Sequence, residues 1–195
     1  MKKEEQLYKI IKTEGYITSK KATELGFPRI YLTILVNQGL IYKVGRGVYS
    51  CNKDFNTNPL VDFQKHNTKI IYSCFTALNL LGFYNFIPDK IHISVPQGYN
   101  ASRYENVEVF YNNDNNYSVG TVFIAMGTDK IIVYNLERTI CDIIKDQNRF
   151  DKRLYNKIIN YYFNQDNINY HKLLEYSKLL RISKKVQEYL SLFKA

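Results

Sequence analysis

Side chains that bind phosphates and bases recur at short spacing between Gly15 and Tyr49. Lysine and arginine neutralise nucleic-acid phosphates, whereas arginine, threonine and asparagine can hydrogen-bond to base edges in the major groove. This pattern favours recognition of double-stranded DNA. The residues expected to contact DNA are Lys20, Lys21, Arg29, Tyr31, Thr33, Asn37, Lys43 and Arg46.

The elements that must position these residues have the order of a winged helix-turn-helix. Apolar spacing, capping residues and glycines predict three helices, a short extended link and a β-hairpin. In chain order they cover residues 4–13, 16–18, 19–25, 28–38, 40–44 and 48–51. The hairpin turn is Gly45-Arg46-Gly47, and its glycines allow the positive φ that a tight turn requires. The link 16–18 is expected to pair with this wing.

The helix over residues 28–38 is the expected recognition helix, because the DNA major groove accepts one α-helix. Its apolar residues predict that Ile30, Ile34 and Leu35 are buried. The side chains then expected to face solvent are Arg29, Tyr31, Leu32, Thr33 and Asn37. Lys43 and Arg46 are expected to lie on the DNA backbone or in the minor groove.

Charge is concentrated at the two ends of the chain. The total is +9, divided as +5 for residues 1–50, −1 for residues 51–150 and +5 for residues 151–195. Basic termini suit a nucleic-acid partner, although lysine-rich helix faces are also common on soluble proteins.

Several other classes of protein are disfavoured by the composition. Apolar residues make up 45% of the chain, but the sequence has no run of eighteen apolar residues, the length needed to span a membrane. The first residues lack the apolar stretch of a signal peptide, so a cytoplasmic protein with reduced thiols is expected. Its three cysteines and three histidines lack metal-ligand spacing, so no metal and no cofactor are expected.

The fold class expected for the whole chain is α+β. A winged-helix DNA-binding domain over residues 1–52 is followed by a polar linker, 53–59, and a mixed C-terminal domain, 60–195, that ends in helices. In that domain we expect a helix over 60–66, an apolar segment over 70–81 that Ser73 could cap, and a helix over 136–145. Strands are expected over 90–96, 107–111, 119–125 and 131–134, a loop over 112–116, and terminal helices over 151–163, 169–180 and 183–193.

Two segments of the C-terminal domain carry polar residues that could form a salt bridge or act as nucleophiles. Arg138 and Asp142 are four residues apart on a predicted helix, which favours a structural salt bridge over an active site. Ser73, Cys74 and Cys141 could act as nucleophiles, but the sequence shows no base placed to activate them. The chain is therefore not expected to be an enzyme.

Taken in order, several short segments resemble the AbiEi family, the antitoxins and autorepressors of the AbiE abortive-infection system, a type IV toxin–antitoxin pair. The segments that carry the resemblance are Ile17–Gly26, Gly39–Tyr49, Tyr72–Gly82, Ile93–Pro96 and Glu137–Asp142. Relatives often have histidine after the serine of the third segment, where Cys74 stands here.

The resemblance implies an N-terminal winged helix that binds inverted repeats in its own promoter. It also implies a C-terminal domain that neutralises a nucleotidyltransferase-like toxin without a stable complex, and that assists cooperative binding to the operator. The basic charge of residues 151–195 suits such a second DNA-binding surface. The residues expected to form it are Lys152, Arg153, Lys157, Lys184 and Lys185.

Two alternatives remain open from the sequence. The winged helix could be a protein-interaction adaptor that binds no DNA, or Ser73 or Cys141 could act in an enzyme that modifies the toxin. No heptad repeat is present, so we expect a monomer in solution that pairs on DNA.

Overall fold

The computed structural model describes residues 2–55, 58–127 and 129–193. The chain divides into two compact units, Met1–Asp62 and Phe63–Ala195, each of which has its own hydrophobic core. The division falls inside a helix, α4, just after the linker expected over residues 53–59. Residues 56 and 57 of that linker lie outside the described ranges.

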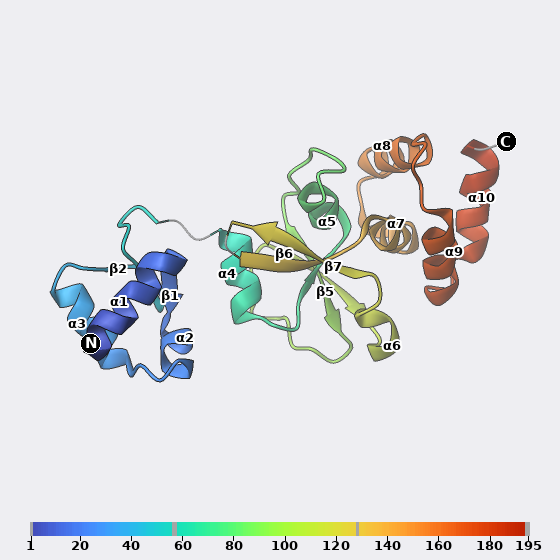
Figure 1. The fold of residues 1–195 in the computed structure, drawn as a ribbon. Helices are drawn as coiled ribbons and strands as arrows, with labels where there is room; N and C mark the ends of the chain where they lie inside the picture. The colour runs from blue at the N-terminus through green and yellow to red at the C-terminus, as the bar shows by residue number, and fades with distance from the viewer. Residues whose placement is uncertain (1, 56–57, 128, 194–195) are drawn as a thin grey trace. The chain divides into compact units, whose positions relative to one another are not determined.

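The N-terminal unit is a winged helix-turn-helix (Figure 1). Its elements are α1 (Lys3–Glu14), β1 (Tyr16–Thr18), α2 (Ser19–Glu24), α3 (Arg29–Asn37), β2 (Tyr42–Gly45) and β3 (Val48–Ser50). The three strands form an antiparallel sheet in the order β1-β3-β2, so the link over residues 16–18 pairs with the wing as predicted.

Apolar spacing on the three helices builds the core of this unit. Leu7 and Ile11 of α1 pack with Leu32 and Leu35 of α3, and all four side chains are almost fully buried. Phe27, in the turn between α2 and α3, is also buried, although the sequence pattern did not predict it as a core residue. Because two faces of α3 cannot both be buried against α1, this packing fixes which face of α3 points outward.

Local hydrogen bonds fix the start of α2 and the tip of the wing together. The Thr18 hydroxyl caps α2 by accepting from the Lys21 amide at 3.1 Å. The next residue, Ser19, donates its backbone N–H to the Gly47 carbonyl at 2.7 Å. Gly47 has a φ of +73°, a conformation that favours glycine. The predicted glycine turn therefore forms and is held against α2.

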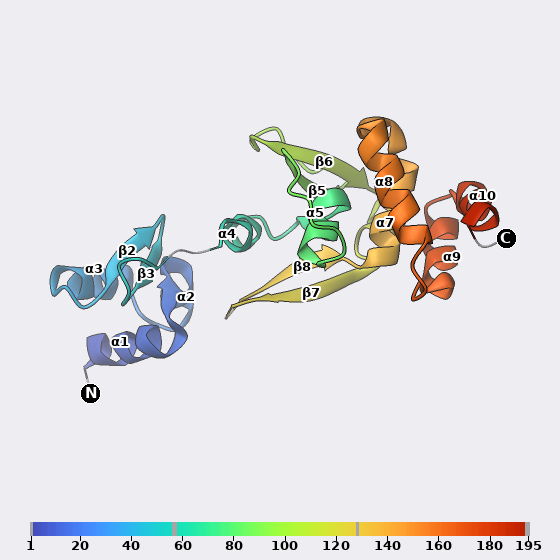
Figure 2. The same ribbon diagram turned by 90° about the horizontal axis from the view of Figure 1, so that it is seen from above.

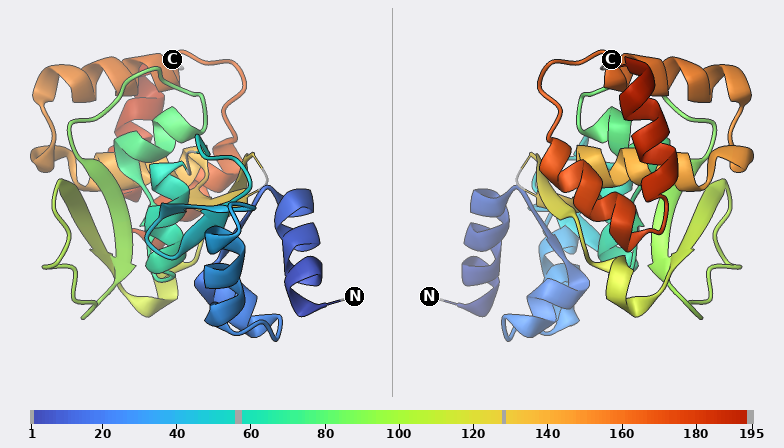
Figure 3. Two further views of the ribbon diagram at one scale, coloured as in Figure 1. Left: turned by 90° about the vertical axis from the view of Figure 1, so that its left-hand side faces the viewer. Right: turned by 90° about the vertical axis from the view of Figure 1, so that its right-hand side faces the viewer.

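The C-terminal unit contains a five-stranded mixed sheet in the order β6-β5-β4-β8-β7. Its elements are α4 (Pro59–His66), β4 (Ile71–Tyr72), α5 (Cys74–Leu80), β5 (Ile91–Pro96), β6 (Val107–Asn112), α6 (Asp114–Tyr117), β7 (Thr121–Met126), β8 (Asp129–Tyr134), α7 (Leu136–Lys145), the 3-10 turn Gln147–Arg149, α8 (Lys152–Phe163), α9 (Tyr170–Leu179) and α10 (Ser183–Phe193). Helices α7 to α10 form a group at one end of the sheet (Figure 2), and the right-hand view of Figure 3 shows α9 and α10 in front of the sheet.

Two predicted segments of this unit differ from the structure. The loop expected over residues 112–116 contains the short helix α6, because the Asn113 side chain caps it by accepting from the Asn116 amide. The apolar stretch 70–81 is divided at Ser73 into β4 and α5. Ser73 is the N-terminal cap residue of α5, but its hydroxyl makes no capping hydrogen bond.

A fully buried arginine organises the junction between α7 and the sheet. The Arg138 Nε donates to Asp142 at 3.1 Å, as the i, i+4 spacing predicted. Its Nη1 donates to the carbonyls of Asn116 and Val119 at 2.7 and 2.9 Å, and its guanidinium lies 4.4 Å from the centre of the Tyr134 ring. A buried cation needs this degree of pairing, since an unpaired one would lose its hydration without compensation.

The side chain of Gln64 takes the place of a strand residue beside β8. Strand β4 has only two residues and pairs with β8 at Tyr72 and Val133. The Gln64 amide donates to the Ile132 carbonyl at 2.8 Å and accepts from the Ile132 N–H at 2.7 Å. Helix α4 is therefore attached to the sheet by a pair of hydrogen bonds of the kind that a neighbouring strand would make.

No helix within residues 2–55, 58–127 and 129–193 is long and apolar enough to cross a membrane.

Gly120 provides a test of the packing around Arg138. Gly120 has a φ of +81°, and a Cβ built there would lie 2.8 Å from the Arg138 Cβ. Gly98 has nearly the same φ, +79°, but open space around it. We expect Gly98→Ala to cost roughly 1–2 kcal/mol through the backbone alone, and Gly120→Ala to cost about 1–3 kcal/mol more through overpacking.

Urea unfolding of the two alanine variants would measure this difference, with Gly98→Ala as the matched control. Equal losses of unfolding free energy in both variants would contradict the close approach of Gly120 to Arg138.

His92 of β5 makes the stability of the C-terminal unit depend on pH. Its ring is buried against three phenylalanines, Phe75, Phe110 and Phe150, at centroid distances of 5.4 to 5.9 Å. Burial lowers the pKa of His92 from 6.5 to about 4, the nearby Glu108 carboxylate raises it, and the cations Arg149 and Lys90 lower it.

In the unfolded chain His92 takes up a proton near pH 6.5, whereas in the folded chain it does so only near pH 4. The free energy of unfolding therefore falls as the pH drops from about 6.5 to about 4. The loss expected from His92 amounts to roughly 3 kcal/mol. Urea titrations across this range should give a flatter profile for His92→Phe, whereas His171→Gln, at an exposed histidine, should keep the slope of the unmodified protein. An unchanged slope in His92→Phe would refute this assignment.

Candidate nucleic-acid interface

The exposed residues of α3 lie on one side of the helix. Arg29, Ile30, Thr33 and Asn37 are exposed, whereas Leu32 and Leu35 are each 1% exposed. Because successive residues of an α-helix are about 100° apart, the four exposed positions fall within a sector of about 100°. We call these four residues the outward sector of α3. A helix face of this width could enter the major groove of DNA.

Two residues of α3 are placed opposite to the prediction, and Tyr31 and Ile34 are half-buried. Ile30, predicted to be buried, is 59% exposed, and Leu32, predicted to face solvent, is buried. The apolar residues of this helix occupy both sides, so spacing alone does not decide which set is inward. Contact of α3 with α1 selects Leu32 and Leu35.

Of the four predicted DNA contacts on α3, three lie in the outward sector. Arg29, Thr33 and Asn37 are exposed and point to the same side of the helix. Tyr31 is half-buried and packs against the hydrophobic core of the N-terminal unit. Tyr31 thus lies outside the sector that the other three form.

The wing carries two exposed cations. Lys43 lies on β2 and Arg46 lies at the hairpin turn. Neither they nor Arg29 form an ion pair with a carboxylate among the described residues. The segment 25–53, which includes α3 and the wing, contains no aspartate or glutamate. Its surface charge is therefore positive, as binding to phosphates requires.

The two lysines at the start of α2 have carboxylate partners. Lys21 lies 2.8 Å from the Glu14 carboxylate, and Lys20 lies 3.9 Å from the Glu24 carboxylate. All four side chains are well exposed, so each pair is worth at most about 1 kcal/mol. A phosphate could compete with these carboxylates for both lysines.

The five residues of the expected second basic surface lie on two helices. Lys152, Arg153 and Lys157 share the exposed side of α8, whose twelve residues include no acid. Lys184 and Lys185 lie in the first turn of α10, where Lys184 is exposed and Lys185 is half-buried. The structure groups the first three residues on one face, which also presents amide side chains.

The candidate nucleophiles are inaccessible in this structure. Ser73, Cys74 and Cys141 are all 0% exposed. Burial raises the pKa of the Cys74 and Cys141 thiols, so both are protonated and poorly nucleophilic at neutral pH. The Cys141 thiol donates to the Leu173 carbonyl, and the Ser73 hydroxyl has no hydrogen-bond partner among the described residues.

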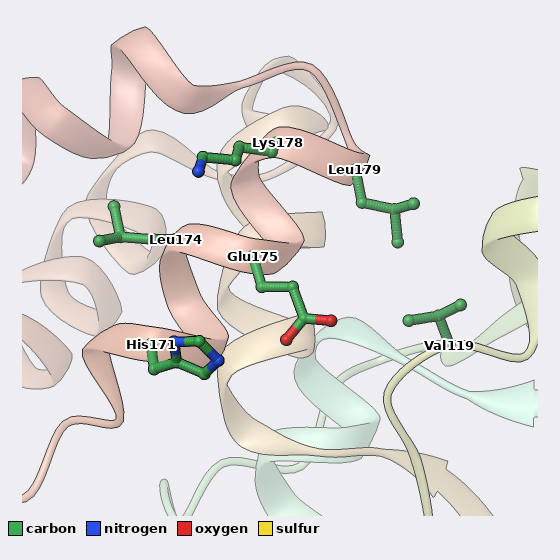
Figure 4. A pocket seen from close by; sticks show the side chains of 6 residues that line it. All are labelled: Val119, His171, Leu174, Glu175, Lys178 and Leu179. Atoms are coloured by element: carbon green, nitrogen blue, oxygen red, sulfur yellow. The ribbon is translucent and has the colours of Figure 1, made fainter.

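A groove of about 580 Å³ lies beside α9 (Figure 4). Leu179 of α9 and Val119 point toward each other across it, whereas Lys178 extends away from Val119. His171 and Glu175 also line the groove, but within the described ranges neither side chain has a hydrogen-bond partner that would orient it for catalysis. Nor does the described part of the chain bring together three histidine, cysteine or acidic side chains that could hold a metal ion.

The comparisons with known proteins agree with the N-terminal architecture. A family model described as "Transcriptional regulator, AbiEi antitoxin" matches residues 5–50, the segment from α1 to the end of the wing. No curated protein matches the chain. Residues 5–50 of this chain are therefore similar to the AbiEi antitoxin transcriptional regulators.

Proposed function

We propose that this chain is a DNA-binding transcriptional repressor of its own toxin–antitoxin operon and a type IV antitoxin. The observation that carries the DNA-binding part is the combination of an outward sector on α3 with unpaired cations on the adjacent wing. The match of residues 5–50 to antitoxin transcriptional regulators supports the same assignment.

In this mechanism α3 enters the major groove, where Arg29, Thr33 and Asn37 reach base edges. Lys43 and Arg46 of the wing neutralise backbone phosphates or enter the minor groove. The hydrogen bond between the Ser19 amide and the Gly47 carbonyl keeps the wing beside the start of α2. Occupation of the promoter by these elements then blocks RNA polymerase.

The proposed operator consists of inverted repeats, each bound by one monomer, with cooperative pairing on the DNA. The exposed basic side of α8, with Lys152, Arg153 and Lys157, is the proposed second contact with bent DNA. Lys184 and Lys185 of α10 are proposed to add to it.

The antitoxin activity is assigned to the C-terminal unit. We propose that it counteracts a nucleotidyltransferase-like toxin in the cytoplasm without a stable complex and without catalysis. The burial of Ser73, Cys74 and Cys141 supports a non-enzymatic role, because none of these groups can reach a macromolecular substrate in this structure.

The adaptor function is the main alternative for the winged helix. It requires the outward sector of α3 to contact a protein instead of DNA, and it predicts no salt-dependent affinity for DNA. The absence of acidic residues from segment 25–53 favours the DNA-binding function, since a surface that carries only cations attracts phosphates.

A mobility-shift titration against the DNA immediately upstream of its own gene tests the proposal directly. Measurements at two salt concentrations with scrambled competitor should give specific, salt-sensitive shifts in two steps. A shift no stronger than that with the competitor would refute the repressor function.

Removal of the wing cations should weaken binding to all DNA sequences. We expect Lys43→Ala with Arg46→Ala to lower affinity roughly tenfold for each lost phosphate contact at 0.1 M salt. It should also reduce the slope of log affinity against log salt by about 0.9 per contact.

The matched control for this pair is Lys9→Ala with Lys12→Ala, which removes the same charge from exposed positions on α1. If both pairs lose affinity equally, the wing has no special contact with DNA and only net charge matters.

Changes on the outward sector of α3 should alter sequence preference instead. Thr33→Ala and Asn37→Ala each remove a group that can hydrogen-bond to a base, so discrimination should fall by roughly 1–3 kcal/mol at the contacted pair. The salt slope should stay unchanged. Competition with duplexes selected from a random library measures this preference, and Tyr31→Phe, outside the sector, is the control. Identical preferences in all variants would contradict the orientation of α3.

A further inference from the structure

Ile30 is an exposed apolar residue at a position where the sequence pattern predicts a buried one. It is the second residue of α3, and its side chain is 59% exposed. It belongs to the outward sector, with Thr33 and Asn37 on the same side of the helix. A single exposed isoleucine is common on protein surfaces, but this one lies in the first turn of a recognition helix.

The core of the N-terminal unit does not explain this isoleucine. Leu32 and Leu35 provide the buried contacts of α3, and Ile30 is neither buried nor among the half-buried residues that pack against the core. Isoleucine also has a lower helix propensity than the straight-chain residues, because its branched side chain is restricted in a helix. Neither packing nor helix formation therefore favours isoleucine at this position.

The chemistry of the major groove does offer an apolar partner. Thymine presents its C5-methyl group there, and none of the other three bases carries an apolar group on its major-groove edge. Residues near the start of a recognition helix commonly contact base edges. We propose that Ile30 is a specificity-determining residue that packs against thymine methyl groups and so favours A·T pairs in the bound site. The proposal rests on the DNA-binding function above.

The surroundings of Ile30 favour DNA over a protein partner. Arg29 precedes it, Lys43 and Arg46 are the exposed cations of the wing, and segment 25–53 has no acidic residue. Leu25, five residues earlier in the sequence, is another exposed apolar side chain; it is 47% exposed and follows α2. If a protein covered this region, Leu25 and Ile30 would act together, whereas contact with thymine requires Ile30 alone.

The experiment compares thymine with deoxyuridine, which lacks only the methyl group. A duplex is first selected from a random library with the full-length protein, and is then synthesised with thymine or with deoxyuridine at every thymine position. The unmodified protein should bind the deoxyuridine duplex roughly fourfold more weakly for each contacted methyl, a change equivalent to about 0.8 kcal/mol. This comparison involves no variant, so it does not depend on the folding of one.

The second arm uses Ile30→Ala, with Leu25→Ala as the matched control. Ile30→Ala should show a clearly smaller preference for thymine than the unmodified protein, because alanine retains only the Cβ methyl. Leu25→Ala should keep the preference for thymine. Thermal unfolding should be nearly unchanged in Ile30→Ala, because the side chain is exposed.

Two results would overturn the proposal. Equal affinity of the unmodified protein for both duplexes would show that no methyl group is read, while its binding to DNA would stand. Equal loss of affinity in Leu25→Ala and Ile30→Ala, with the thymine preference intact in both, would assign the two side chains to a common apolar patch. Failure of the selection to enrich any duplex would instead refute the DNA-binding function itself.

Discussion

The contact between α3 and α1 is the constraint on which the proposed DNA-binding surface depends. Leu32 and Leu35 are buried against Leu7 and Ile11, and burial of each such side chain is worth about 1.5–3 kcal/mol. Rotation of α3 by half a turn would expose these leucines and bury polar residues such as Asn37. The same contacts that stabilise the N-terminal unit therefore determine which residues α3 can present to a partner.

The C-terminal unit is organised by polar groups that cannot reach solvent. Arg138 is fully buried and satisfies its guanidinium through Asp142 and two backbone carbonyls, while Gln64 completes the hydrogen bonding of Ile132. Removal of one partner from such a network leaves the other buried and unpaired, which costs more than loss of a surface pair. The resemblance that includes Glu137–Asp142 thus falls on a segment whose arginine holds the helix α7 to the sheet.

The two proposed activities are assigned to different units. In the N-terminal unit, cations and hydrogen-bonding groups are exposed on α3 and the wing, as contact with a polyanion requires. In the C-terminal unit, the chemically reactive side chains Ser73, Cys74 and Cys141 are buried, and the exposed charge lies on helix faces. The exposed charged faces of both units, rather than these buried side chains, are the parts proposed to contact other molecules.

The sequence by itself determined the local elements, because caps, glycines and apolar periods act over a few residues. Thr18 and Asn135 cap the helices that were predicted after them, Gly47 forms the wing turn, and Arg138 pairs with Asp142. Only the tertiary structure decided the orientation of α3, since Ile30, Leu32, Ile34 and Leu35 are similarly apolar and contact with α1 selects among them. The role of Gln64 was equally hidden, because its partner Ile132 is 68 residues away and no local pattern connects them.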